Sequence, residues 1–190
     1  MKHLVLAASA ALVLAPALAG AQPSAGPDPG NLTRYSRGIT ARYDNIKRDI
    51  VDAADAVPES EYSFRPTPEV RTFGEIISHV ADSQNFYCGV ADGANPEYAT
   101  PIEKAHGTKA EIVKALKDSV AKCDAVYAKT TADNAMSIEK AGRGEVLRGM
   151  ILLDNVAHDN EHYGNIVTYM RLKGHVPPST LREQKGSGRQ

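Results

Sequence analysis

The chain has 190 residues and a formal net charge of −1, with 42% hydrophobic and 24% charged residues. This length and composition are typical of one globular domain with an N-terminal extension. Because positive and negative charges nearly balance, no broad basic surface argues for binding to nucleic acid or to anionic lipid.

Residues 1–21 have the pattern of a secretory signal peptide. A short basic start precedes an apolar run over residues 4–18, and Ala19-Gly20-Ala21 offers a small-residue cleavage site. The alternative is a retained membrane anchor, but an apolar run of about 15 residues is short for a span of about 20. We expect a mature protein that begins at Gln22, is periplasmic or secreted, and has no membrane span after cleavage.

The segments on either side of the predicted domain are polar and rich in turn-forming residues. Residues 22–32 contain several Pro, Gly and Ser residues, which predicts a flexible leader. Residues 181–190 are polar and are expected to form a flexible tail. The domain itself is predicted to cover residues 33–180.

Apolar residues recur in this domain at helical spacing, and little of it has the alternation of a strand. Helices are predicted from about Thr33 to Val57, from Thr72 to the Gly and Pro residues that begin at Gly89, from Thr108 to about Tyr127, and from Glu145 to Lys173. The second and third begin with capping boxes, in which a Thr is followed three residues later by a Glu. Four amphipathic helices of this length predict an all-α fold, a four-helix bundle.

Two histidines one turn apart, His158 and His162, are the first indication of a metal site. They share one arc of the fourth predicted helix with its apolar residues, and side chains at this spacing have Cβ atoms about 5–6 Å apart. Two ring nitrogens can then bind a single cation, each at about 2.0–2.1 Å if it is zinc. The alternative is a pair of histidines at the edge of the core, hydrogen-bonded to neighbours.

His79, near the edge of the apolar face of the second predicted helix, is the candidate third ligand. A lone histidine in such a place is more often structural. In helix bundles, however, facing helices contribute ligands to one interior site. Three neutral imidazoles would leave the fourth position of a zinc-type ion open. We therefore predict a divalent metal site formed by His79, His158 and His162.

Two carboxylates, Asp82 and Asp154, each lie within one turn of a candidate ligand and are the candidate catalytic residues. Either could orient a ligand imidazole or act as a general base for a bound water. Solvated surface charge is the alternative for both, and it is the expectation for Asp159 and Glu161.

The two cysteines, Cys88 and Cys123, are too few and too far apart for a small disulfide scaffold. Export would permit a disulfide, whereas their helical settings favour buried free thiols equally. The sequence leaves both states open.

Two runs of the sequence resemble the DinB/YfiT-like superfamily of metalloproteins. YSFRPTPEVRTFGEIISHVADSQNFYCGV is similar to the family segment that carries its first metal-binding histidine, which matches His79. LLDNVAHDNEHYGNIVTYMRLKGHVPP is similar to the family's last helix, whose H-x-x-x-H pair matches His158 and His162. The resemblance covers about residues 33–179 and implies a four-helix bundle with zinc or nickel held by three histidines, often as a homodimer.

The resemblance implies a metal-dependent hydrolase or a thiol S-transferase, in which the ion lowers the pKa of a water or of a substrate thiol. Its small-molecule substrate is not identified by the sequence. The export signal departs from the family pattern, because most members are cytoplasmic, and this argues against a cytoplasmic thiol cofactor. The alternatives are a non-catalytic metal-binding or stress-response protein of the periplasm, and a helical interaction protein whose histidines bind nothing.

Overall fold

The computed structural model describes residues 28–187 of the chain. The predicted signal peptide and the first part of the predicted leader, residues 1–27, lie outside the described residues, as do residues 188–190. None of the helices that are described is both long enough and apolar enough to span a bilayer.

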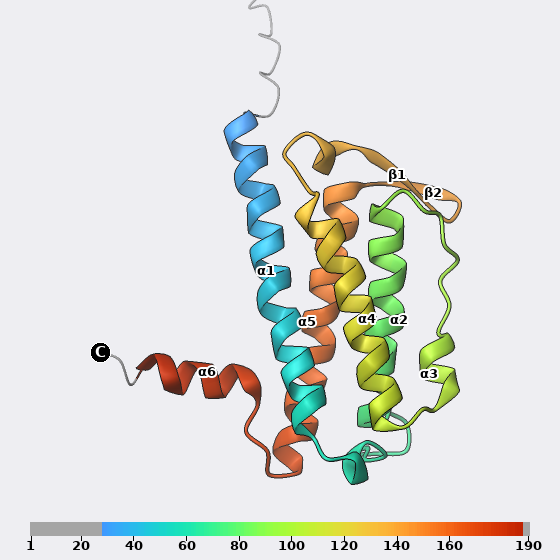
Figure 1. Ribbon diagram of the computed structural model, residues 1–190, viewed down its shortest axis with the longest axis vertical. Coiled ribbons are helices and arrows are strands. Elements are labelled where there is room, and N and C mark those ends of the chain that lie inside the picture. The colour runs from blue at the N-terminus through green and yellow to red at the C-terminus, as the bar shows by residue number, and fades with distance from the viewer. Residues whose placement is uncertain (1–27, 188–190) are drawn as a thin grey trace, which may run out of the picture.

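The described chain is mostly helical, and its long helices α1, α2, α4 and α5 lie side by side (Figure 1). The elements in chain order are α1 (Pro29–Ala56), η1 (Glu59–Glu61), α2 (Phe73–Ala91), α3 (Pro101–Ala105), α4 (Lys109–Ala128), η2 (Asn134–Met136), β1 (Ile138–Ala141), β2 (Gly144–Leu147), α5 (Arg148–Leu172) and α6 (Pro178–Ser187). Each of the four helices predicted from the sequence corresponds to one of the long helices.

Both predicted capping boxes are confirmed. The Thr72 side chain accepts a hydrogen bond from the backbone N–H of Glu75, whose carboxylate accepts one from the backbone N–H of Thr72. Thr108 and Glu111 make the same reciprocal pair at the start of α4. These bonds satisfy N–H groups of the first turn that have no partner inside the helix.

Several predicted boundaries are wrong. Helix α1 starts at Pro29 instead of Thr33, because Asp28 caps its first turn and proline is well suited to the first helical position. The fourth predicted helix starts at Arg148 instead of Glu145, because the preceding residues form β2, which pairs with β1 as an antiparallel hairpin. The structure also contains α3 between the second and third predicted helices. Helix α6 begins at Pro178, within the predicted domain, and extends through most of the predicted flexible tail.

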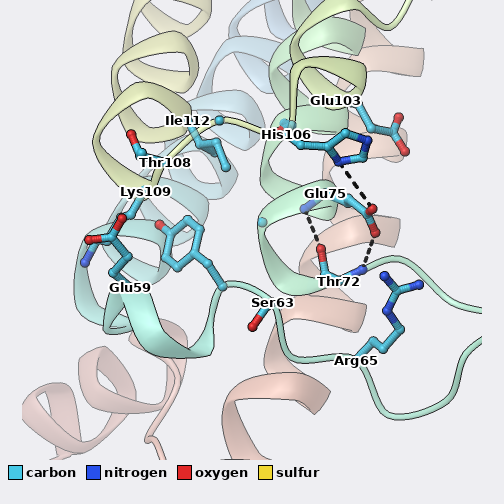
Figure 2. Close-up of a pocket in the computed structure, with 14 residues that line it drawn as sticks. Glu59, Ser63, Arg65, Thr72, Glu75, Glu103, His106, Thr108, Lys109 and Ile112 are labelled. Atoms are coloured by element: carbon cyan, nitrogen blue, oxygen red, sulfur yellow. Dashed lines mark hydrogen bonds and ion pairs between the residues drawn. The ribbon is translucent and has the colours of Figure 1, made fainter.

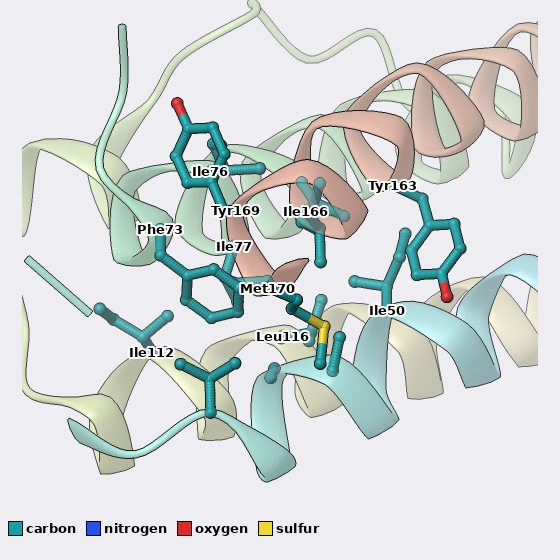
Figure 3. Close-up of a cluster of buried hydrophobic side chains, with 14 of the residues drawn as sticks. Ile50, Phe73, Ile76, Ile77, Ile112, Leu116, Tyr163, Ile166, Tyr169 and Met170 are labelled. Carbon is teal, nitrogen blue, oxygen red and sulfur yellow. The ribbon is translucent and has the colours of Figure 1, made fainter. Parts of the chain in front are cut away.

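The apolar side chains of the four long helices form two core clusters. The first core cluster includes Ile50, Phe73, Ile77, Leu116, Ile166 and Met170 (Figure 3). The second includes Tyr43, Cys88, Val90, Cys123, Tyr127 and Leu152. In the second, the rings of Tyr43 and Tyr127 stack with their centroids 3.9 Å apart. Because such clusters are densely packed, they fix the rotation of α2 and α5 about their axes.

A disulfide joins Cys88 on α2 to Cys123 on α4 inside the second core cluster. Their Cα atoms lie 5.3 Å apart, within the usual range for a disulfide. The sequence left this pairing open, because the distance between two helices depends on how they pack and is not encoded in their separation along the chain.

Candidate metal centre

The three predicted ligands lie together in the structure. His79 projects from α2, and His158 and His162 project from α5. The Nε2 atom of His158 lies 3.2 Å from Nε2 of His79 and 3.1 Å from Nε2 of His162. One nitrogen from each ring can be chosen so that all three lie within 4.8 Å of one another. No other group of this kind is found among residues 28–187.

The spacing of these nitrogens fits a shared divalent ion. Two imidazole nitrogens, each about 2.0–2.1 Å from one tetrahedral zinc ion, lie about 3.3 Å apart. The observed separations from His158 are 3.2 and 3.1 Å. Neutral imidazoles that turn lone pairs toward one another have no common proton to share, and a cation between them satisfies all of the lone pairs. The donor set therefore can hold a metal ion.

All three rings favour the neutral form that a metal requires. Burial lowers the pKa of His158 to about 3, with help from the two neighbouring histidines and from Arg71. Burial also lowers the pKa of His162 to about 4 and, by a smaller amount, that of His79. Near pH 7 each ring therefore keeps a free lone pair, which is the state that binds a cation.

Sequence reasoning missed a carboxylate that orients one of the rings. Nδ1 of His79 lies 3.1 Å from Oε2 of Glu103 on α3. A carboxylate accepts only, so this nitrogen carries the ring proton and Nε2 keeps its lone pair toward the cluster. Nδ1 of His158 and Nδ1 of His162 are buried and have no hydrogen-bond partner among residues 28–187. Of the three rings, His79 is thus the one whose orientation a carboxylate fixes.

Asp82, one of the two predicted catalytic residues, binds the backbone of α3. Its Oδ1 accepts from the backbone N–H of Ile102 at 3.2 Å, and its Oδ2 from that of Glu103 at 2.9 Å. Each oxygen of a carboxylate has a second lone pair, so these bonds do not test the predicted catalytic role of Asp82, which stays a prediction. They hold the backbone of Glu103 in the position from which that side chain reaches His79.

Of the other carboxylates considered, Asp154 and Asp159 differ from expectation and Glu161 does not. The side chain of Asp154 is exposed and forms no hydrogen bond or ion pair with the described residues, so it does not support His158 as predicted. Asp159, which we expected to be solvated, is fully buried and accepts a hydrogen bond from Gln84 at 2.9 Å. Glu161 is exposed, as expected.

The remaining histidines of the described chain lie outside the cluster. His106 is exposed after α3, and its Nδ1 lies 3.8 Å from a carboxylate oxygen of Glu75. His175 has its Nε2 2.7 Å from a carboxylate oxygen of Glu61.

A cavity of about 440 Å³ lies beside the three-histidine cluster. Its walls include Arg71, Ile76, Glu103, His162, Asn165 and Tyr169. A second cavity, of about 350 Å³, lies near the start of α2 and the end of α3 and contains none of the three histidines (Figure 2). Glu103 lines both cavities. The first cavity gives a small molecule room next to His162.

Comparisons with known proteins agree with this architecture. Residues 42–166 match the family model of the DinB superfamily. Among curated proteins, none matches the chain. A DinB-like protein from Bacillus cereus has 18% identity and a TM-score of 0.60, with 75% of this chain and 95% of that chain covered.

Two further solved structures have the same fold. A DinB-like protein from Bacillus subtilis has 19% identity and a TM-score of 0.60, covering 73% of this chain and 93% of that chain. A mycothiol-dependent maleylpyruvate isomerase has 18% identity and a TM-score of 0.52, covering 74% of this chain and 61% of that chain. At this level of identity the structures show the fold alone. The family model, which spans most of the chain, shows that this protein belongs to the DinB superfamily.

Proposed function

We propose that this protein binds one divalent metal ion, zinc or nickel, through Nε2 of His79, His158 and His162. The observation that carries the proposal is the convergence of these atoms, 3.2 and 3.1 Å from the central nitrogen, on rings that burial keeps neutral. Such a donor set is typical of sites with three histidines and an open fourth position.

We further propose that the ion serves a reaction on a small molecule, as a hydrolase or a thiol S-transferase. The cavity of about 440 Å³ that includes His162 in its wall supports this, because a purely structural ion needs no adjacent space. When bound, a divalent ion lowers the pKa of a coordinated water or thiol and so supplies a nucleophile near neutral pH.

In this function the chain's own residues bind, orient and exclude water. Glu103 holds the proton of His79 on Nδ1, so that Nε2 faces the cluster. Asp82 fixes the backbone that carries Glu103. Ile76, which is buried in the first core cluster, forms an apolar part of the cavity wall.

The second candidate is a non-catalytic metal-binding protein, in which the ion only holds α2 and α5 together. The low exposure of His79 and His162, each at 7%, favours this function, because buried ligands release an ion slowly. The two candidates differ in turnover: the enzyme is expected to convert a thiol and an electrophile, or to cleave a simple ester or amide, only when metal is present.

We propose that the protein works outside the cytoplasm. The signal-peptide pattern of residues 1–21 and the disulfide between Cys88 and Cys123 both support this, because disulfides persist in oxidising compartments. Fractionation of cells that express the untagged chain tests it: we expect a form that lacks residues 1–21, recovered outside the cytoplasm.

Metal analysis of the untagged protein after dialysis tests the central proposal. We expect one ion per chain in the wild type and a loss of stoichiometric metal in His79→Ala, His158→Ala and His162→Ala. His106→Asn is the matched control, because His106 is 71% exposed and has a left-handed backbone that asparagine tolerates. Equal metal content in all five proteins would contradict the assignment of the ligands.

A further inference from the structure

Arg71 lies at the junction between the predicted metal centre and the cavity beside it. Its Nε donates to Oε1 of Glu103 at 2.7 Å, while Oε2 of the same carboxylate contacts His79. Its backbone carbonyl accepts a hydrogen bond from the hydroxyl of Tyr169 at 2.8 Å. Arg71, Glu103 and Tyr169 all line the cavity of about 440 Å³. The guanidinium is thus held on one side while its other side remains available.

The two terminal nitrogens of this guanidinium form no hydrogen bond with any of residues 28–187. The side chain is 41% exposed, so these nitrogens can reach a molecule in the cavity. Two parallel N–H donors on a planar group match the two oxygens of a carboxylate. The unused edge of Arg71 is therefore suited to a small carboxylic acid.

The charge of Arg71 has a second consequence for the three histidines. Its positive potential reaches the cluster, because its guanidinium pairs with Glu103, whose other carboxylate oxygen contacts His79. The same potential disfavours a cationic ligand in the cavity beside Arg71, except where the negative charge of Glu103 offsets it. An anion located between Arg71 and a bound ion is attracted by both.

The other charges around the cavity limit which anion fits. Glu103 is already engaged with Arg71 and His79, and Glu69 is fully exposed to water at the cavity wall. Two carboxylates near the site disfavour a doubly charged phosphate more than a singly charged carboxylate. Val70 and Ile76 add apolar wall, and Asn165 adds an amide.

We propose that the cavity binds a small molecule that carries one carboxylate, with Arg71 as the residue that recognises it and the rest of the molecule directed toward the three-histidine centre. This inference rests on the proposed function and names the class of its substrate. Arg71 is then a specificity-determining residue.

Calorimetric titration of the zinc-loaded protein tests this proposal, with butyrate, its neutral analogue butyramide and inorganic phosphate as probes. We expect butyrate to bind at least about tenfold more tightly than butyramide or phosphate. In Arg71→Gln we expect butyrate affinity to fall about tenfold, because a charge-assisted pair is lost. Arg65→Gln is the matched control, since Arg65 lines the second cavity and not the first (Figure 2).

Zinc content measured on the same samples separates this proposal from the metal site. We expect Arg71→Gln to keep its zinc, because removal of a neighbouring positive charge does not weaken cation binding. If Arg71→Gln keeps its full zinc content and its butyrate affinity is unchanged, the carboxylate site is overturned and the metal site is not. Equal affinity of the wild type for butyrate and butyramide would have the same consequence. Loss of zinc with unchanged butyrate affinity would assign Arg71 to positioning Glu103 only. Absence of zinc from the wild type would overturn both proposals.

Discussion

His158 and Asp159 are adjacent on α5, yet their polar atoms lie in opposite kinds of environment. Asp159 accepts from Gln84 of α2, and Gln84 accepts from Ser119 of α4, which gives a closed chain of contacts across three helices. His158 instead faces two other imidazoles, and its Nε2 lies 3.2 Å from that of His79 and 3.1 Å from that of His162. This cluster lies beside a cavity that His162 lines. Oδ1 of Asp159 has no partner among the described residues, and protonation of this carboxyl group removes its charge. The three buried imidazoles can instead be satisfied by a cation.

The largest expected change in stability comes from Asp159, in the closed chain of contacts with Gln84 and Ser119. Burial raises the pKa of Asp159 from 3.8 to about 7, and its Oδ1 has no partner among the described residues. The folded protein therefore holds a proton that the unfolded chain has already lost, and stability falls as the pH rises from about 4 to 7. In urea denaturation with chelator present, Asp159→Asn is expected to be about 4 kcal/mol more stable than the wild type at pH 8 and equally stable near pH 3.

Glu161→Gln is the control for this prediction, because Glu161 is an exposed acid on the same helix. Its stability is expected to follow the wild-type pH profile. A wild-type profile in Asp159→Asn would mean that Asp159 is ionised in the folded protein and that the closed chain of contacts is stronger than inferred.

The next effect concerns the second core cluster, away from the histidines. Removal of the disulfide in the double variant Cys88→Ser, Cys123→Ser is expected to lower the free energy of unfolding by about 2–4 kcal/mol, because the unfolded chain regains conformational freedom. Metal content is expected to stay the same, since neither cysteine belongs to the three-histidine cluster. Loss of metal in this variant would show that the two regions are coupled.

Removal of the metal is expected to lower the free energy of unfolding of the wild type, but not that of a variant that lacks one of the metal ligands. With free ion at a hundred times its dissociation constant, chelation lowers the free energy of unfolding by about 2.7 kcal/mol. Asp159→Asn is expected to lose the same amount, and His158→Ala to lose none. Equal responses of His158→Ala and the wild type to chelation, measured by denaturant titration, would contradict the distinction between the two clusters.

The smallest predicted effect is that of the orienting carboxylate. Glu103→Gln is expected to weaken metal binding about tenfold, because His79 loses a charged acceptor at Nδ1. Competition with a coloured chelator measures this change. Glu97→Gln is the matched control, as Glu97 is exposed on the same connection. Unchanged affinity in Glu103→Gln would leave that residue with the sole role of binding Arg71.

The parts of the fold that depend on local sequence could be predicted. The capping pairs at Thr72 and Thr108 marked two helix starts, and the apolar stripes indicated four long helices. The spacing of His158 and His162 placed both rings on one side of α5, where the structure has them. In each case the responsible contacts lie within a few residues of one another.

The parts that depend on distant contacts could not be predicted. Glu103 lies on a five-residue helix within a Pro- and Gly-containing connection, and it meets His79 only because Asp82 binds the amides of that helix. Asp154 shares the helical arc of His158 in projection, but the packing of α5 leaves it exposed. Asp159 looked like surface charge because its partner Gln84 is 75 positions away.

X-ray absorption at the metal edge of the untagged protein tests the central claim most directly. The account predicts one ion per chain with three imidazole nitrogens at about 2.0–2.1 Å, and one nitrogen fewer in any residual metal of His158→Ala. An ion surrounded by oxygen or sulfur alone, or a protein that takes up no ion at all, would contradict it.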